Sequence, residues 1–78
     1  MSRLNLRRMR RNQRGIISEI TAEGEMGRRI RDMGLVPGAR FTVRGRAPLY
    51  DPVALRLRGF TLTLRNNEAD YIQAEVEE

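Results

Sequence analysis

The sequence contains no cysteine, no histidine and no lysine. Without cysteine, the chain can form neither disulfides nor thiolate metal sites. Without histidine, it lacks the usual general base, the commonest transition-metal ligand and the side chain that titrates near neutral pH. Its carboxylates are scattered, and none of these three residue types is present to complete a nucleophile–base pair. We therefore expect no enzymatic activity, no metal site and no cofactor.

Long apolar runs are also missing. No apolar segment approaches the roughly 20 residues of a membrane-spanning helix, and no hydrophobic segment follows the basic start as a secretory signal requires. The chain has 78 residues, which predicts one domain with a thin core. These observations predict a cytoplasmic domain.

Positive charge is abundant but unevenly distributed. The formal net charge is +5, and all 15 basic residues are arginine. Six of them lie in the first 14 residues, which contain no acidic residue. Residues 15–78 contain the other nine arginines and all ten acidic residues, so their net charge is −1. The sequence therefore predicts a basic arm (residues 1–12) on a nearly neutral domain (residues 13–78), with no basic face evident within that domain.

Alternating apolar and polar residues predict a mainly β domain. Such period-2 patterns are typical of half-buried antiparallel strands. Residues 16–20 form a short β-rich run, and the alternating segments are residues 41–44, 53–57, 60–64 and 71–76. Arg58-Gly59 leaves only two residues between segments 53–57 and 60–64, which predicts a tight hairpin.

One short helix is expected between the first two strands. Met26, Ile30 and Met33 form a single apolar stripe over residues 24–33. About five antiparallel strands and one helix fit a small SH3-like barrel best, because a bent barrel removes exposed sheet edges. An OB-like barrel is the second choice. It is disfavoured because OB-fold strands are usually longer than the segments in this sequence.

The stretch RDMGLVPGAR, residues 31–40, is predicted to end the helix and reverse the chain. Gly34 fits the left-handed position after a helix, and Leu35 is then placed to pack against Ile30. Pro37 and Gly38 fit the central positions of a type II turn. A phosphate-binding loop would need G-x-x-x-x-G-K-[ST] or G-x-G-x-x-G leading into the start of a helix. Here the glycines follow a helix, and the chain contains no lysine. We interpret Gly34, Leu35, Pro37 and Gly38 as a structural corner.

The same stretch resembles a motif of the FeoA family, the ferrous iron transport protein A family. Residues 29–38 resemble its R-L-x-x-M-G-L-x-P-G motif, and residues 46–52 resemble its A-P-L-x-D-P segment. Gly59 with Leu62, Leu64 and Arg65 resembles its G-x-x-L-x-L-R strand, and the closing segment from Glu68 resembles E-A-x-x-I-x-V. The resemblance runs from about Leu6 to the end of the chain.

The resemblance implies both a fold and a role. Family members are small SH3-like barrels associated with bacterial ferrous iron uptake, thought to act on the cytoplasmic side of the GTPase permease FeoB. By this resemblance the protein is an adaptor that binds a membrane GTPase permease, in the cytoplasm and at the inner face of the membrane. The alternative is a regulatory or nucleic-acid-binding module like the SH3-like domain of metal-dependent repressors. The few aromatic residues and the near-neutral charge of residues 13–78 argue against nucleic acid as a partner.

One segment stands out as a candidate for partner binding. It consists of Pro48, Leu49, Tyr50, Asp51 and Pro52, between two predicted strands. One interpretation is structural, with Leu49 closing an end of the barrel and Tyr50 covering a turn. The other is a stiff aromatic and apolar knob that binds a protein partner, because rigid anchors lose little entropy on binding.

The basic arm has three interpretations. Its four central arginines are Arg7, Arg8, Arg10 and Arg11. They form a solvated tail, contact anionic phospholipid headgroups at about 1 kcal/mol per charge, or contact nucleic-acid phosphates. Leu6 and Met9 fall where the FeoA family has apolar residues, so part of the arm is expected to dock on the barrel. Met9 is also an alternative start, which would remove much of the arm.

Overall fold

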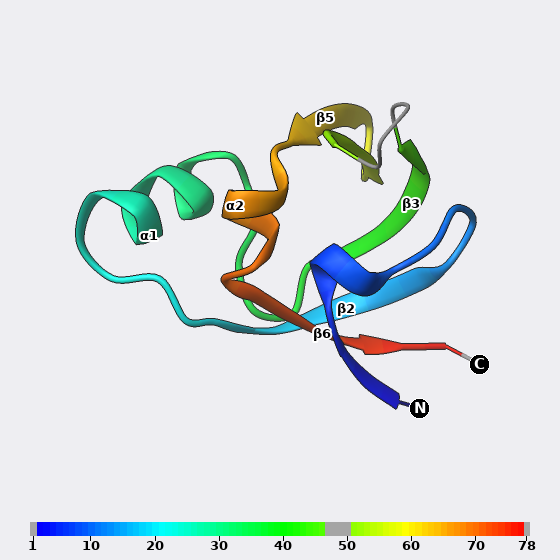
Figure 1. Ribbon diagram of the computed structural model, residues 1–78, viewed down its shortest axis with the longest axis horizontal. Helices are drawn as coiled ribbons and strands as arrows, with labels where there is room; N and C mark the ends of the chain where they lie inside the picture. Colours follow the sequence, from blue (N-terminus) through cyan, green and yellow to red (C-terminus); the bar gives the residue numbers. More distant parts are fainter. Residues whose placement is uncertain (1, 47–50, 78) are drawn as a thin grey trace.

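A six-stranded antiparallel sheet forms the body of the protein (Figure 1). The computed structural model describes residues 2–46 and 51–77. The strands are β1 (Ser2–Asn5), β2 (Arg14–Ile20), β3 (Arg40–Arg46), β4 (Val53–Leu57), β5 (Phe60–Leu64) and β6 (Ile72–Val76). The helices are the 3₁₀ turn η1 (Leu6–Arg8), α1 (Gly24–Asp32) and the single turn α2 (Asn66–Ala69). The strand order is β1-β6-β2-β3-β4-β5.

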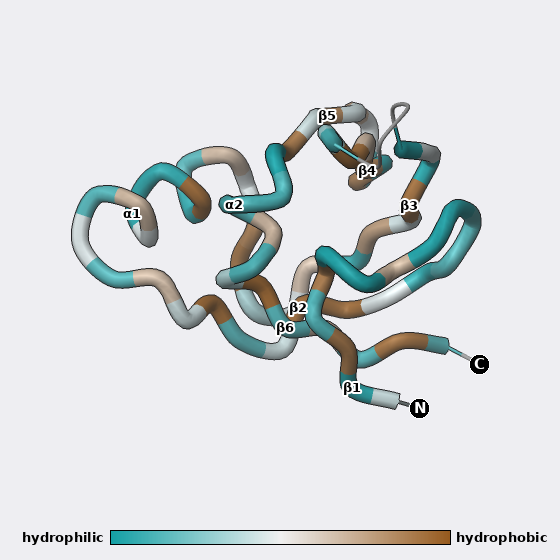
Figure 2. Tube along the Cα trace, in the orientation of Figure 1, coloured by the Kyte–Doolittle hydropathy of each residue, from teal (hydrophilic) through white to brown (hydrophobic). Residues whose placement is uncertain are grey.

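The alternating residues of the strands form the core, as the sequence predicts. Buried positions recur at every second residue in β4 and β6, because successive side chains of a strand point to opposite faces. Figure 2 shows that hydrophobic positions concentrate on the strands, whereas the turn between η1 and β2 is hydrophilic. Among the described residues, no helix is long and apolar enough to span a membrane.

The mainly β prediction is confirmed, but the structure adds a strand that the sequence did not indicate. Residues Ser2–Asn5 pair with β6 in the register Ser2↔Val76 to Asn5↔Gln73. After β1, η1 buries Leu6 completely, and Met9 is 1% exposed. Residues 2–9 therefore contribute both an edge strand and core side chains to the barrel.

The corner after α1 has the geometry of a Schellman cap followed by a turn. Gly34 has φ 94°, its N–H donates to the Arg31 carbonyl at 2.9 Å, and the Leu35 N–H donates to the Ile30 carbonyl at 3.3 Å. Leu35 and Ile30 are both fully buried in one core cluster. Gly38 then has φ 93°, and the residue after it donates its N–H to the Val36 carbonyl at 3.0 Å, which closes the type II turn.

Candidate functional site

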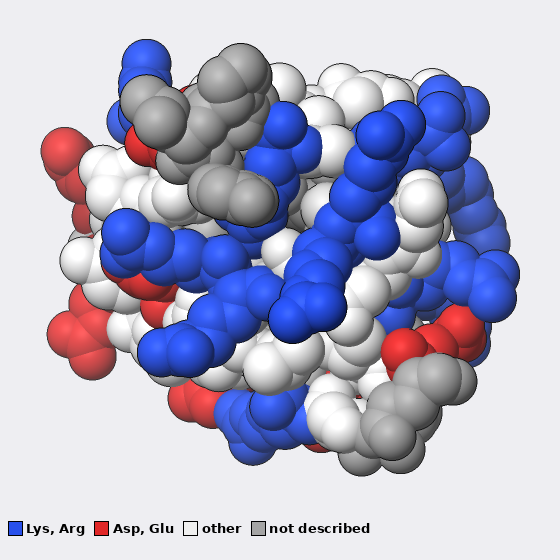
Figure 3. All heavy atoms as spheres, turned by 45° about the vertical axis from the view of Figure 1, so that its right-hand side comes forward, with Lys and Arg blue, Asp and Glu red and all other residues white. Residues whose placement is uncertain are grey.

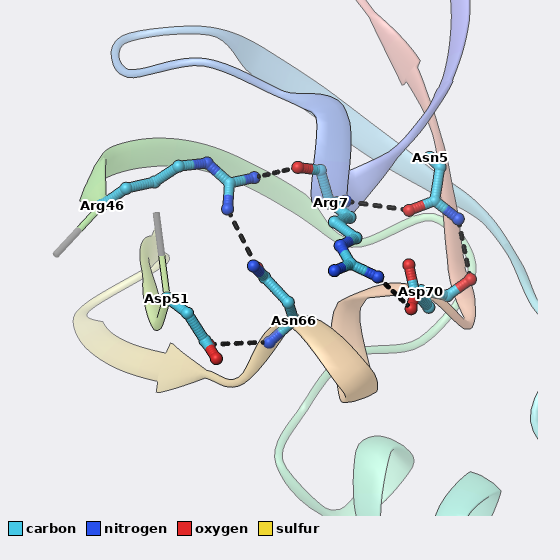
Figure 4. A network of polar contacts seen from close by, with 6 residues as sticks. All are labelled: Asn5, Arg7, Arg46, Asp51, Asn66 and Asp70. Carbon is cyan, nitrogen blue, oxygen red and sulfur yellow. Dashed lines mark hydrogen bonds and ion pairs between the residues drawn. The ribbon is translucent and has the colours of Figure 1, made fainter. Parts of the chain in front are cut away.

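Arg46, the last residue of β3, connects the N-terminal segment to that strand. From the end of β3, its guanidinium donates to the carbonyl oxygens of Leu6 (2.9 Å), Arg7 (2.7 Å) and Met9 (2.9 Å). These carbonyls lie in or just after η1, where helix ends leave carbonyls without intrahelical donors. The Leu6 carbonyl also accepts the Met9 N–H at 3.1 Å. Figure 4 shows the Arg46 side chain reaching across to Arg7.

Partial burial has an electrostatic consequence for this arginine. Desolvation and, to a smaller extent, the positive charge of Arg7 lower the pKa of Arg46, whereas Asp51 raises it. An arginine has so high a pKa that it stays charged in proteins. The cation is therefore retained, and its hydrogen bonds to carbonyl oxygens offset the cost of desolvation.

The segment predicted to bind a partner is only partly within the described residues. Pro48, Leu49 and Tyr50 lie outside them. Asp51 is exposed, and its Oδ1 accepts a hydrogen bond from the Asn66 backbone N–H at 2.9 Å (Figure 4). The Asn66 side chain in turn accepts from Arg46 at 3.1 Å. The C-terminal end of the segment is thus anchored to α2 and, through it, to Arg46.

The predicted arginines of the arm have unequal surroundings. Arg7 forms an ion pair with Asp70 at 2.8 Å. The Asn5 side chain contacts both residues, because it accepts a hydrogen bond from the Arg7 backbone N–H and donates one to the Asp70 carbonyl. Arg8, Arg10 and Arg11 are exposed. In the described part of the chain, none of these three has an ion-pair partner.

A second set of arginines lies on the outer surface of strands β2 to β4. The register pairs Arg14 with Thr42 and Thr42 with Arg56, so these three form one row across the sheet. Arg40 belongs to the adjacent row, opposite Ile16. Directly opposed residues of paired strands project from the same face. This face of the sheet is therefore basic.

The two sets of arginines are continuous. One shallow depression is lined by Arg8, Arg10 and Arg11, and a second by Arg11 and Arg14. A third is lined by Arg14, Arg40, Arg56 and Arg58. We call these seven residues the arginine face, which comprises Arg8, Arg10, Arg11, Arg14, Arg40, Arg56 and Arg58. In Figure 3, basic side chains cross the middle of the molecule as seen from this side.

The sequence did not indicate this face, because the charge sum of residues 13–78 conceals how charge is arranged. The signal that could have found it is the alternation in β3 and β4. Phe41 and Val43 are buried and Arg40 is exposed, while Leu55 and Leu57 are buried and Arg56 between them is exposed. The pattern identifies which arginines point outward, but only the register brings them together.

An exposed aromatic residue borders the arginine face. Phe60 is 45% exposed, although the strand pattern predicts it on the same side as the buried Leu64. It shares a depression with Arg40 and Arg58 and lies beside Gly34. Its place directly after the hairpin turn leaves it at the rim of the sheet, where nothing in the described chain covers it fully.

Acidic side chains are not gathered into a metal-ligating group in the described residues. Glu68, which is 6% exposed, has a structural environment. Its Oε1 accepts from the Arg65 N–H at 3.0 Å at the start of α2, which is the side-chain-to-N-cap half of a capping box. Its Oε2 lies 3.4 Å from Nε of Arg29 on α1, so this carboxylate links the two helices.

Comparison with known proteins gives a consistent family. Residues 4–76 match the model of the FeoA domain. The chain is 32% identical over 73 residues to a fusion of Fe(2+) transport protein A with the Fe(2+) transporter FeoB from Porphyromonas gingivalis. That match covers 94% of this chain and 9% of the fusion protein, so the chain spans about a tenth of that relative's length.

Solved structures agree with this family. An FeoA-like protein from Clostridium acetobutylicum is 37% identical, with a TM-score of 0.90 over 100% of this chain and 91% of the other. The zinc complex of FeoA from Stenotrophomonas maltophilia, described as a prokaryotic SH3 domain protein, is 18% identical with a TM-score of 0.80 and 96% coverage of both chains. A manganese-dependent transcriptional repressor is 19% identical with a TM-score of 0.88, over 99% of this chain and 42% of the repressor. The last two share the fold, and the SH3-like prediction is confirmed.

Proposed function

The chain belongs to the FeoA family of ferrous iron transport, and we propose that it is a non-enzymatic adaptor that binds the cytoplasmic part of an FeoB-type GTPase permease. The observation that supports this most is the relative in which such a domain and FeoB are one polypeptide. Covalent fusion keeps two domains at high effective concentration, which is useful when they interact. The adaptor would act on the cytoplasmic side, at the periphery of the inner face of the membrane.

Within this proposal, the contact with the permease is made by the segment from Pro48 to Pro52. Support comes from the sequence, which places an aromatic and an apolar residue between two prolines. It also comes from Asp51, whose bond to the backbone of α2 anchors one end of the segment. An aromatic anchor on an anchored segment loses little entropy on binding.

The experiment is a pull-down of the cytosolic part of a ferrous permease encoded in the same genome, with and without guanine nucleotide. We expect binding by the full chain, and Tyr50→Ala should weaken it at least about tenfold, as expected for an interface aromatic. Tyr71→Ala is the matched control, because Tyr71 is the other tyrosine and is 39% exposed. It should bind as the unchanged chain does.

The possible results separate the two parts of the proposal. Binding that is equal for Tyr50→Ala and Tyr71→Ala would keep the adaptor function and move the contact elsewhere. No binding with either nucleotide state would contradict the adaptor function itself.

A regulatory or nucleic-acid-binding module is the second candidate, and the arginine face is the observation that favours it. This function predicts binding to a duplex oligonucleotide that weakens steeply with salt, because phosphate contacts release counterions. The likeness to the manganese-dependent repressor concerns the fold alone and does not decide between the candidates. A chain that binds duplex DNA but no permease domain would establish the second candidate over the first.

A further inference from the structure

The arginine face has a large excess of charge without partners. In the part of the chain that the structure describes, Arg14 alone of its seven members has an ion pair, with Glu77 at 3.3 Å. The other six are exposed, and no carboxylate of residues 2–46 or 51–77 lies within ion-pair distance of them. Like charges gathered on one surface repel each other and destabilise the fold slightly. A surface of this kind is best explained by an anionic partner that relieves the repulsion.

The distribution of the charges favours a broad partner over a small one. The seven arginines come from the η1 segment, the turn before β2, and strands β2, β3 and β4 with its hairpin. A single phosphate would need several donors converging at one point in a buried site. Here exposed side chains are spread along three neighbouring depressions. A wide anionic surface can contact all of them together.

The aromatic residue at the rim favours a lipid surface over a nucleic acid. Single-stranded nucleic acids are usually held by several aromatic platforms. In the described chain, Phe41 and Phe60 both line depressions with arginines of the face, but Phe41 is 3% exposed, and only Phe60, at 45%, presents an exposed ring there. Peripheral membrane proteins combine basic side chains at the headgroups with a few apolar or aromatic side chains at the interface. Arg40, Arg58 and Phe60 form this combination.

We propose that the arginine face binds an anionic phospholipid surface, with Phe60 at its rim entering the interfacial region. The choice of a membrane over other broad anionic surfaces rests on the proposed function, which brings the chain beneath a membrane permease. Contact with lipid headgroups was one of three interpretations of the arm. The arm contributes Arg8, Arg10 and Arg11 to this face, and the sheet with its hairpin supplies the rest.

This arrangement also orients the domain. In Figure 1, α1 lies at the opposite end of the molecule from the chain termini and the turn before β2. With the arginine face on the membrane, the corner at the end of α1 lies beside Phe60, and α1 extends from there toward the end of the molecule opposite the turn before β2. Arg28 and Arg31 on α1 are exposed arginines that have no ion pair within the described residues and lie outside the face, so they serve as controls of equal charge.

The test is co-sedimentation of the full chain with vesicles containing phosphatidylglycerol, compared with vesicles of phosphatidylcholine alone. We expect binding to the former only, decreasing with salt. Each arginine near an anionic surface contributes about fivefold, so Arg40→Gln with Arg58→Gln should weaken binding about 25-fold. Arg28→Gln with Arg31→Gln removes the same charge and should leave binding nearly unchanged. Circular dichroism verifies that both variants are folded.

Three outcomes would overturn the inference. The first is no sedimentation with phosphatidylglycerol vesicles, and the second is an equal loss in the two double variants. The third is binding to a duplex oligonucleotide, lost in the Arg40 and Arg58 variant, at a salt concentration where vesicles are not bound. Because these vesicles contain no permease, a chain that binds the permease domain but not the vesicles would refute this inference and leave the proposed function intact.

Discussion

The corner after α1 and the N-terminal segment before β2 are similar in length but differ in how their conformations are determined. In the corner, the hydrogen bonds that close the cap and the type II turn join residues three to five positions apart, from Arg31 with Gly34 to Ile30 with Leu35. In the N-terminal segment, the principal bonds come from distant residues, with Arg46 and β6 as the main partners. The cap and turn of the first region are closed by local bonds, and Gly38 and Ala39 also bond Ile17 of β2. The second region is held in place mainly by the tertiary fold.

The largest expected effect tests whether the N-terminal segment belongs to the core as fully as the corner does. Leu6 and Leu35 are both 0% exposed, so Leu6→Ala and Leu35→Ala should each lower the free energy of unfolding by about 3 kcal/mol through lost burial and a cavity. Urea denaturation followed by circular dichroism measures both. A nearly neutral Leu6→Ala would mean that the segment is a solvated arm in solution.

The next effect concerns the link that holds the N-terminal segment. Arg46→Met keeps much of the side-chain length but removes the donors to three backbone carbonyls. We expect a loss of about 2 kcal/mol of unfolding free energy, because the carbonyls lose three hydrogen bonds from a charged donor. Arg44→Met, an exposed neighbour on the same strand, should change it by less than about 0.5 kcal/mol. Equal effects would show that Arg46 is not the link.

The smallest effect tests the local character of the corner. Gly34→Ala places a side chain at φ 94°, and the left-handed backbone should cost about 1 kcal/mol of unfolding free energy. Gly45→Ala is the control, since a Cβ there meets nothing within 4 Å and the backbone is not left-handed. It should be neutral or slightly stabilising. A loss for Gly45→Ala as large as that for Gly34→Ala would remove backbone conformation as the explanation.

The arginines of the arginine face divide in the same way, into residues close together in the sequence and residues brought together by the fold. Arg8, Arg10 and Arg11 were identifiable because they lie within four positions of one another in a segment without acidic residues. Arg14, Arg40 and Arg56 were not, because they are separated by up to 42 positions and their charges cancel in the sum over residues 13–78. Their assembly depends on the register Arg14↔Thr42↔Arg56. Register in turn depends on the hydrophobic pattern of all three strands at once.

The N-terminal strand shows why composition misleads in a short basic segment. Six arginines in 14 residues suggest a solvated arm, yet Leu6 at the start of η1 and Met9 directly after it are both buried. The arginines around them remain exposed or pair at the surface, as Arg7 does with Asp70. A segment with few apolar residues is therefore part of the core when those few residues pack against the apolar side chains of the sheet.

The amino-acid sequence by itself determined the alternating strands, the helix with its Gly34 cap, the Pro37-Gly38 turn and the family, because each rests on residues close together along the chain. The tertiary structure decided the sixth strand, the role of Arg46 and the arginine face. These depend on which distant residues become neighbours, and that choice follows from packing the whole apolar set into one small core, which no local pattern contains.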